Sequence, residues 1–291
     1  MIALATAAAV PSEFDDDRLL AAALARRGAE AVSVVWDDPD VQWHRFHRVV
    51  IRSTWDYPRK REAFLAWADA LDSRLENPPA VVRWNSDKHY LADLVAAGIP
   101  TVPTSFVDPD SEIPLLQGEV VVKPTISAGA RDTGRFGPST HDQARRLISR
   151  LESDGRTAMV QPYVSSVDVS GESALTFIAG RFSHAAHKRP VLRPDEVAPV
   201  RDDEIGGAEV MYDPDIVGPG TASEREIEVA TEAVAYLRER FDVAPLYARV
   251  DLVAGQDGDP LLLELEAVEP NLFLRLSPGA ANALAQAVLE H

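Results

Sequence analysis

Two alternating segments joined by a turn, between residues 246 and 273, constrain the fold more than any other part of the chain. Residues 247–253 and 261–268 each alternate with a period of two, and residues 255–260 have the glycine, aspartate and proline content of a tight turn. A hairpin folded about this turn places Asp251 roughly opposite Glu264, with Arg249 and Glu266 next along the same face. The leucines of the second strand then fill the opposite face.

The acidic face of this hairpin predicts a metal site. Three carboxylates on one face repel each other unless a positive charge lies between them. Asp251, Glu264 and Glu266 offer the oxygen ligands that suit Mg²⁺, which shares its other positions with water and phosphate oxygens. A solvated face on an acidic protein explains any one of these acids alone, whereas three converging acids favour the metal. A metal that handles phosphates requires a nucleotide site elsewhere in the chain.

The composition limits the classes of partner. A net charge of -17 argues against duplex nucleic acid or an anionic membrane as partner, but not against a small anion held in a local basic pocket. The chain has no cysteine, which excludes disulfides, a thiolate nucleophile and zinc–thiolate sites and fits a cytoplasmic enzyme. The apolar residues 1–10 lack a basic n-region and are interpreted as a buried strand, not a signal peptide. No stretch is long and apolar enough to span a membrane.

The first part of the chain predicts an open α/β unit. Strands at 2–7, 31–35 and 48–51 alternate with helices at 16–27 and 60–75, the order typical of a parallel sheet. Ligands of such sheets lie beyond the carboxyl ends of the strands, so the polar and aromatic tip at 52–58 is a candidate substrate wall. There Arg52 could pair with a substrate carboxylate and Asp56 with an amine, beside Trp55. A simple capping turn explains the tip equally well.

Two further lysines follow in positions that suit phosphates. Ser86 or Asp87 is expected to cap a helix running to residue 97, which places Lys88 in its first turn, where the helix dipole disfavours a cation without an anionic partner. Lys123 ends an apolar strand at 119–125, and the small residues of the loop at 126–138 could fold over phosphates with their N–H groups. Taken alone, each feature is also explained by a surface lysine or a surface turn.

The remaining segments predict a second lobe. A helix at 140–153 precedes a strand at 158–164, in which Pro162 suggests a hinge. A hairpin at 171–188 turns at residues 179–180 and ends in Lys188. His184 and His187 fall on opposite faces of its second strand, which argues against a metal pair. Residues 189–220 are expected to form an exposed excursion, followed by helices at 224–241 and 280–290.

Together these segments resemble the ATP-grasp ligase superfamily over roughly residues 80–275, preceded by a segment similar to its pre-grasp domain. The layout is most similar to the glutathione-synthetase and ribosomal-protein-glutamate-ligase branch. Residues 83–88, 161–172, 183–188 and 264–270 resemble the O-ureido-serine cyclo-ligases of cycloserine biosynthesis. The resemblance implies an α/β ATP-grasp fold, α+β in its C-terminal lobes, with an N-terminal open parallel sheet. It divides the chain into a pre-grasp domain (1–84), a central subdomain (85–157) and a C-terminal subdomain with the metal site (158–291).

The resemblance also implies roles for residues. Asp251, Glu264 and Glu266 would hold Mg²⁺, although the wider family commonly has Asn at the position of Glu266. Arg249 would stabilise the acyl phosphate and the tetrahedral intermediate, assisted by Lys188. The implied ATP contacts, from phosphates through the adenine hinge to ribose, are Lys88, Lys123, Ser127, Ala128, Gly129, Gln161, Tyr163, Val164 and Asp168. The implied substrate pocket comprises Arg52, Trp55, Asp56 and Arg131.

The reaction that follows from the resemblance consumes ATP in two steps. A carboxylate or ureido carbonyl of a small amino-acid-like substrate becomes an acyl phosphate, and a nitrogen nucleophile then displaces phosphate, in a possible cyclisation. The loop at 127–133 and the tip at 53–57 depart from the cyclo-ligases, which leaves an intermolecular amino-acid and amine ligase as an alternative. A phosphotransferase on the same fold and a nucleotide-binding protein without turnover are further alternatives. A homodimer is a family expectation.

Overall fold

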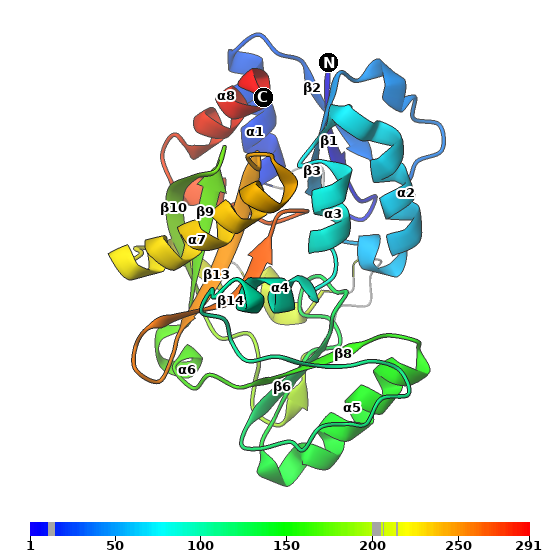
Figure 1. The fold of residues 1–291 in the computed structure, drawn as a ribbon. Helices are drawn as coiled ribbons and strands as arrows, with labels where there is room; N and C mark the ends of the chain where they lie inside the picture. The colour runs from blue at the N-terminus through cyan, green and yellow to red at the C-terminus, as the bar shows by residue number, and fades with distance from the viewer. Residues whose placement is uncertain (11–14, 200–204, 206, 214) are drawn as a thin grey trace.

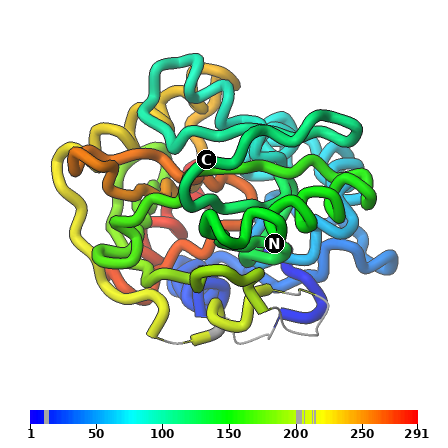
Figure 2. Tube along the Cα trace, turned by 90° about the horizontal axis from the view of Figure 1, so that it is seen from below, coloured from blue at the N-terminus to red at the C-terminus, as the bar shows by residue number. Residues whose placement is uncertain are grey.

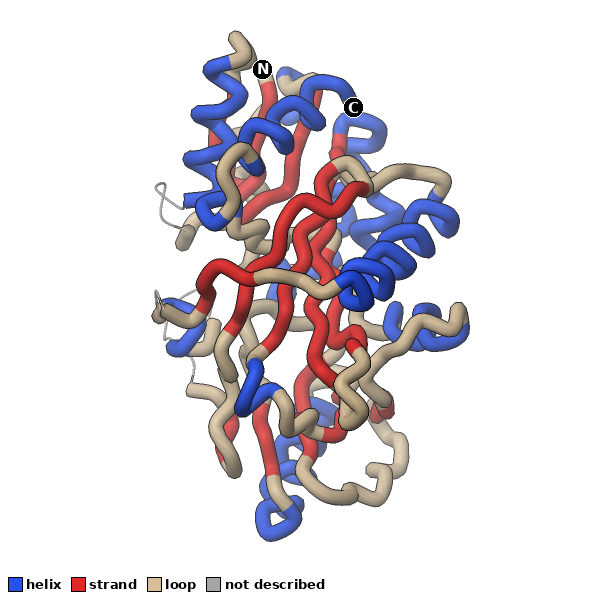
Figure 3. Tube along the Cα trace, turned by 90° about the vertical axis from the view of Figure 1, so that its left-hand side faces the viewer, coloured by secondary structure: helices blue, strands red, loops and turns tan. Residues whose placement is uncertain are grey.

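Three β-sheets follow one another along the long axis of the protein (Figure 1). The computed structural model describes residues 1–10, 15–199, 205, 207–213 and 215–291. In Figure 1 the N-terminal sheet lies at the top, the sheet that carries the 246–273 hairpin in the middle, and the sheet of residues 105–162 at the bottom. Figure 3 shows the strands of the three sheets in red along this axis.

The N-terminal sheet is four-stranded, with the order β2-β1-β3-β4, and all of its pairings are parallel. Apolar side chains of α1 and α8 pack on one face and those of α2 on the other, so β1 is buried on both sides, as parallel strands usually are. The predicted open parallel sheet is confirmed. Its elements are β1 (Ile2–Thr6), α1 (Asp15–Arg26), β2 (Ala31–Val35), β3 (Arg48–Ser53), α2 (Arg61–Leu71), β4 (Leu75–Glu76) and α8 (Ala280–Glu290), with 3₁₀ turns η1 (Trp43–Arg45), η2 (Tyr57–Arg59) and η3 (Asp72–Arg74).

Two short helices replace the single helix expected up to residue 97. α3 (Pro79–Asn85) begins at a proline, whose fixed φ and missing N–H suit the first helical position, and Ser86 is its C-cap. α4 (Tyr90–Ala96) begins two residues after Lys88. The predicted N-cap at Ser86 or Asp87 is therefore wrong, and Lys88 lies between the helices, where its backbone N–H donates to the Thr125 carbonyl at 3.0 Å.

The lower sheet is antiparallel, with the order β11-β7-β6-β8-β5, and α5 covers it (Figure 2). The sequence missed β7, which lies inside the expected loop at 126–138. At Gly134 in that strand an added Cβ would lie 2.5 Å from the Phe136 ring, so the strand depends on a glycine. The expected division at residue 157 assigns β8 to the C-terminal subdomain, whereas β8 pairs with β6 in this sheet. The elements are β5 (Ser105–Val107), β6 (Val120–Pro124), β7 (Gly134–Phe136), η4 (Pro138–Thr140), α5 (His141–Ser153), β8 (Ala158–Pro162) and β11 (Glu196–Val197).

The middle sheet is antiparallel, with the order β12-β10-β9-β13-β14. Both predicted hairpins are confirmed, and Ala179 and Gly180 at the first turn have φ of +49° and +71°, the backbone that a two-residue hairpin turn requires. α7 is anchored at its start by a reciprocal capping box between Ser223 and Glu226. The elements are α6 (Val167–Ser170), β9 (Glu172–Ile178), β10 (Arg181–Lys188), η5 (Glu209–Tyr212), β12 (Val217–Gly220), α7 (Glu224–Phe241), β13 (Tyr247–Ala254), β14 (Pro260–Glu266) and η6 (Leu274–Leu276).

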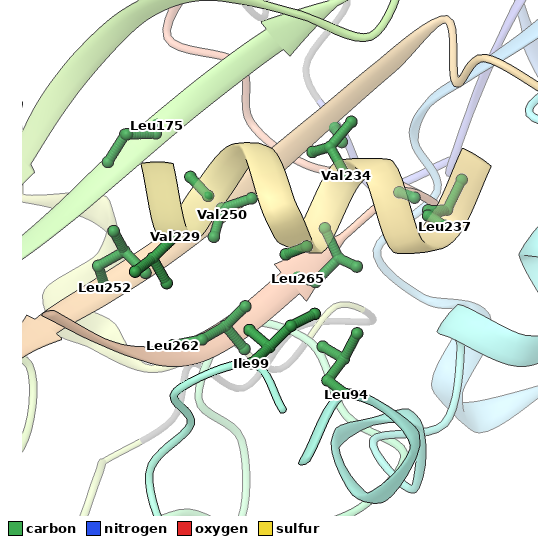
Figure 4. Packing of buried hydrophobic residues seen from close by; sticks show 14 of the residues in the cluster. Leu94, Ile99, Leu175, Val229, Val234, Leu237, Val250, Leu252, Leu262 and Leu265 are labelled. Carbon is green, nitrogen blue, oxygen red and sulfur yellow. The ribbon is translucent and has the colours of Figure 1, made fainter. Parts of the chain in front are cut away.

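A large apolar core lies between α7 and the middle sheet (Figure 4). Val229, Val234 and Leu237 of α7 pack in the same cluster as Val250 of β13 and Leu265 of β14, and all five are almost fully buried. Burial of each such side chain stabilises the fold by roughly 1.5–3 kcal/mol. This packing holds the predicted hairpin rigidly in place, so the side chains on its other face have fixed positions.

The excursion at 189–220 is not simply exposed in its described part. Ile205 and Ala208 are buried, and Val191, Leu192 and Met211 line the pocket described below. The prediction failed because isolated apolar residues among prolines and aspartates show no periodicity. Residues 200–204, 206 and 214 of this segment lie outside the described residues. Within the described part of the chain, no helix is both long and apolar enough to cross a membrane.

Candidate active site

A cavity of about 500 Å³ lies where the three sheets approach one another. Its walls come from the middle sheet, from β6, β8 and the loop between β6 and β7, and from the tip that follows β3. Such a volume is typical of a small-molecule site. Most of the residues that the sequence implicated line this cavity: Trp55, Lys88, Lys123, Ser127, Ala128, Gly129, Gln161, Tyr163, Val164, Lys188, Arg249, Asp251, Glu264 and Glu266.

The hairpin places its charged residues in the predicted register. Asp251 pairs with Glu264 across the two strands, and Arg249 pairs with Glu266. The Arg249 guanidinium donates to both carboxylate oxygens of Asp251, at 2.8 Å and 2.9 Å, and also to Glu266. A fourth donation, at 3.0 Å, reaches the backbone carbonyl of Asn271. These bonds fix the orientation of the guanidinium toward the cavity.

Lysines complete the pairing of the acids. Lys188 Nζ donates to Glu172 at 2.6 Å and to Asp251 at 2.9 Å, and Lys123 Nζ donates to Glu264 at 2.5 Å. The three hairpin acids therefore face cations and not one another. Over the described residues, no group of three His, Asp or Glu side chains is close enough to hold a metal ion in this arrangement.

The charges of this network shift its pKa values strongly. Burial raises the pKa of Glu264, but Lys123, Lys88 and Lys188 outweigh it and hold that pKa well below its usual range. Burial, together with the charges of Asp251 and Glu264, raises the pKa of Glu266 to about 7 despite Arg249. Burial lowers the pKa of Lys188, but Asp251 and Glu172 outweigh it and raise the value above the usual range. The site thus keeps its cations charged, while the raised pKa of Glu266 lies near neutrality.

Lys88 lies beside the small-residue loop, as the phosphate interpretation requires. Its Nζ donates to the Ser127 carbonyl at 3.2 Å. Gly129 has a φ of +63°, and its carbonyl accepts the Ala208 N–H at 2.7 Å, which ties the loop to the 189–220 segment. Arg131 belongs to the same loop but lies outside the residues that line the cavity.

At the opposite wall, Gln161, Tyr163 and Val164 line the cavity where β8 ends. The Gln161 side chain donates to Thr104 Oγ1 at 2.9 Å, which orients its amide. Asp168 is not among the lining residues. It accepts two hydrogen bonds of 2.7 Å from Arg135 and one of 2.7 Å from the Tyr163 hydroxyl, so it acts here on the hinge through Tyr163.

Two residues of the β3 tip do not reach the cavity, contrary to expectation. Arg52 is 1% exposed and lies against Asp16 and Asp17, with a hydrogen bond of 3.3 Å to the Pro270 carbonyl. Asp56 accepts the Trp36 indole N–H at 2.8 Å and pairs with Lys60. The charged groups of Arg52 and Asp56 are therefore both bound to other residues of the protein. Trp55 does line the cavity, and its indole N–H donates to the Glu269 carbonyl at 3.1 Å.

Tyr57 of the predicted tip also lines the cavity, and the lining residues that were not predicted include Asn85, Glu269 and Asn271. Asn85 was missed because α3, which ends at this residue, was not predicted. Its side chain hydrogen-bonds the backbone of Leu265 and Ala267. Glu269 and Asn271 follow the hairpin, beyond the alternating pattern that carried the prediction. Two polar residues around a proline directly after a buried strand were the available signal.

The chain is similar to known proteins over its whole length. The family described as "D-cycloserine synthetase DcsG, N-terminal domain" matches residues 2–77. The cycloserine biosynthesis protein DcsG of Streptomyces lavendulae is 37% identical over 303 residues, covering 100% of this chain and 98% of its own length. The crystal structure of D-cycloserine synthetase DcsG superimposes with a TM-score of 0.89 at 36% identity, over 99% of this chain and 98% of that one.

More distant structures share the fold. The D-alanine–D-alanine ligase from Bacillus anthracis, complexed with ATP, has a TM-score of 0.68 at 13% identity, over 99% of this chain and 96% of that chain. A RimK domain ATP-grasp protein from Sphaerobacter thermophilus has a TM-score of 0.65 at 18% identity, over 99% and 100%. The resemblance stated from the sequence and the predicted fold class are confirmed. This chain has the fold of the ATP-grasp ligases and belongs to the family of the cycloserine biosynthesis protein DcsG.

Proposed function

We propose that this protein is a cyclo-ligase that uses ATP and Mg²⁺ to close the ring of O-ureido-serine, through an acyl phosphate on the substrate carboxylate. One observation carries the proposal: four charged residues line the same cavity in a connected arrangement. Lys123 bonds Glu264, Glu264 lies opposite Asp251 in the hairpin, and Asp251 bonds Arg249. The full-length relationship to a cycloserine biosynthesis protein supports the choice of substrate.

The nucleotide would occupy the part of the cavity between the middle and lower sheets. Lys88 and Lys123 would contact its phosphates, and the N–H groups of residues 127–129 would close over them. Gln161, Tyr163 and Val164 would line the adenine, and Asp168 would reach the ribose by exchanging its bond with Tyr163. The apolar lining near Val164 suits a base that stacks and bonds at its edge.

Asp251, Glu264 and Glu266 would hold Mg²⁺. Their carboxylate oxygens are the donors that this ion prefers, and all three line the cavity. Because each carboxylate is paired with a cation, metal binding would exchange lysine and arginine partners for the ion. The bound ion would supply positive charge next to the phosphate oxygens.

In the first step a carboxylate oxygen of the substrate would attack the γ-phosphorus of ATP, forming an O–P bond as the bond to ADP breaks. Lys123 and Lys188 would balance the negative charge of the transferring group. In the second step the ureido nitrogen that is bonded to oxygen would attack the acyl carbon, the acyl C–O bond would break, and phosphate would leave with the proton released from the nitrogen. The Arg249 guanidinium, held by Asp251 and Asn271, would donate to the oxyanion of the tetrahedral intermediate.

The test is phosphate release with Mg·ATP and a panel of amino acids and both enantiomers of O-ureido-serine, singly and in pairs. Release with a single ureido substrate, lost in Glu264→Gln but kept in the exposed control Glu232→Gln, supports cyclisation. Release only with substrate pairs would instead identify an intermolecular ligase. A stable phosphoester in place of free phosphate would identify a phosphotransferase. ATP binding without any turnover would contradict the enzyme assignment to this substrate class.

A further inference from the structure

Glu269 lies at the end of the cavity that faces the N-terminal sheet. It follows β14 and lines the cavity together with Trp55 and Tyr57, which come from the tip after β3. The Trp55 indole donates to its backbone carbonyl at 3.1 Å, and the Tyr57 side chain hydrogen-bonds its carboxyl group. The nucleotide elements β6 and β8 belong to the lower sheet, at the other end of the molecule (Figure 1). Glu269 therefore lies at the end of the cavity away from β6 and β8.

Glu269 differs from the other cavity acids in its charge balance. Asp251, Glu264, Glu266 and Glu172 each have a lysine or arginine within hydrogen-bond distance. For Glu269, no ion pair within 4.0 Å is found among the described residues. Burial, then the charge of Glu266, raises its pKa to about 8, with Lys88 and the Tyr57 hydroxyl acting in the opposite direction.

A partly buried carboxyl group without a paired cation is less favourable as an anion, and a cationic ligand relieves that cost. A primary ammonium supplies the missing charge and three hydrogen-bond donors. The neighbouring aromatic side chains also favour a cation over an anion. The remaining cationic groups of the cavity, Arg249, Lys123 and Lys188, lie on the middle and lower sheets, where they suit the carboxylate and phosphate groups.

We propose that Glu269, supported by Tyr57 and Trp55, binds the α-ammonium group of the amino-acid substrate. This role rests on the ligase function proposed above and adds the determinant that distinguishes an amino acid from a simple carboxylic acid. It also orients the substrate, because the ammonium is held at one end while the carboxylate points toward Arg249. The groups that face the Glu269 carboxyl are Glu266 of β14, Lys88 and Tyr57.

The first experiment measures binding without turnover. Calorimetry with protein saturated with Mg·AMPPNP compares O-ureido-D-serine with 3-(ureidooxy)propanoate, which lacks only the amino group. The wild type is expected to bind the amino compound at least about 30-fold more tightly, the value of one charge-assisted contact. Glu269→Gln should abolish this preference and leave the affinity for the analogue within about threefold. Equal binding of both compounds by the wild type would overturn the proposal.

A second readout separates ammonium binding from a merely structural role. Because the pKa of the Glu269 carboxyl is raised to about 8, the carboxyl holds a proton at neutral pH, and pairing with an ammonium displaces it. Calorimetry in two buffers of different ionisation enthalpy counts this proton. We expect release by the wild type and by Glu232→Gln, and none by Glu269→Gln, in which a neutral amide replaces the mostly neutral acid. No release by the wild type contradicts the proposal.

Steady-state kinetics complete the test. Glu269→Gln should raise the KM for O-ureido-D-serine by at least about tenfold, with kcat within about threefold and the KM for ATP unchanged. A fall of kcat with an unchanged KM would make Glu269 a general base or a structural group, and would overturn its role in recognition. If the wild type shows ammonium-dependent binding but no phosphate release, the ligase reaction proposed above fails while the role of Glu269 stands.

Discussion

Arg249 and Asp251 stand two residues apart on β13 and share two hydrogen bonds of 2.8 Å and 2.9 Å. Residues i and i+2 of a strand point to the same face, so the pair is built by the strand itself. Both side chains are almost completely buried. A guanidinium locked in this way loses little freedom when an oxyanion forms in front of it, which is what pre-organised catalysis requires.

Asp251→Asn is expected to lower both stability and activity. The change removes the negative charge that the buried cations Arg249 and Lys188 share. This lowers the free energy of unfolding by about 3 kcal/mol. Denaturant unfolding and phosphate release measure the two effects. Asp257→Asn, at the exposed turn of the same hairpin, is the matched control and should change neither. An Asp251→Asn protein of wild-type stability would show that the network is not a source of stability.

Arg249→Lys should keep the fold but lose at least about a hundredfold in kcat, because an ammonium cannot reproduce the bonds to Asp251 and to the Asn271 carbonyl. Phosphate release under saturating substrate, together with the ATP-induced shift in Tm, separates chemistry from binding. Retention of both in the lysine variant would mean that charge alone suffices.

Gly129→Ala tests the loop beside Lys88. Its φ of +63° disfavours any other residue, and the new Cβ would lie 3.1 Å from the Gly207 Cα, so the loop must shift. We expect the KM for ATP to rise at least about fivefold, since the loop N–H groups move. Gly155→Ala has a similar φ of +71° but nothing within 4 Å, and therefore controls for backbone strain. Equal effects of the two variants on ATP would contradict the role of the loop.

Tyr247→Phe should destabilise the contact between the hairpin and the N-terminal sheet. The buried hydroxyl donates toward the carbonyls of Ile51, at 2.6 Å, and Val268, at 3.0 Å. Its removal leaves buried acceptors unpaired, at about 1–3 kcal/mol. Thermal unfolding measures the loss, and Tyr236→Phe, on the outer part of α7, should change the Tm little. A larger fall in Tm for Tyr247→Phe than for Tyr236→Phe supports the contact, whereas equal falls contradict it.

His184 makes stability depend on pH. Burial lowers the pKa of its imidazole, although the carbonyls of Leu272 and Phe273 and the charge of Asp16 oppose the shift. Below about pH 6.5 the unfolded chain binds a proton that the folded state resists, so stability falls as pH decreases. The fall in Tm between about pH 7.5 and about pH 5.5 should be smaller in His184→Gln than in the exposed control His187→Gln. The same slope in both would exclude His184 as the source.

Local pattern was enough to predict the elements with strong periodicity. The register of Asp251 against Glu264 followed from alternation and one turn, and α7 and α8 from amphipathic spacing. Arg52 shows where this reasoning stops. A charged residue at the carboxyl end of a parallel strand is well placed to bind a ligand. In the folded protein, however, Arg52 is paired with Asp16 and Asp17 of α1. Such competition between partners distant in sequence is decided by packing and not by local pattern.

The strand order of the lower sheet was harder to predict for the same reason. β11 comes from the 189–220 segment but extends the lower sheet, beside β7. Glu269 lies after the hairpin. Its position in the site is defined by hydrogen bonds from Trp55 and Tyr57, which lie more than two hundred residues earlier in the chain. A single sequence contains no direct record of these long-range contacts, so the corresponding residues were missed.

The carboxylate of Asp16 accepts the backbone N–H groups of Leu272 and Leu274, and α8 packs against Leu20 and Leu24 of α1. The segment that leads out of the active site is thereby clamped onto the N-terminal helix. For protein engineering this means that the first 77 residues are not an exchangeable cassette. A chimera between two relatives must transfer residues 269–291 together with the N-terminal sheet, because the joint between them runs through both ends of the polypeptide.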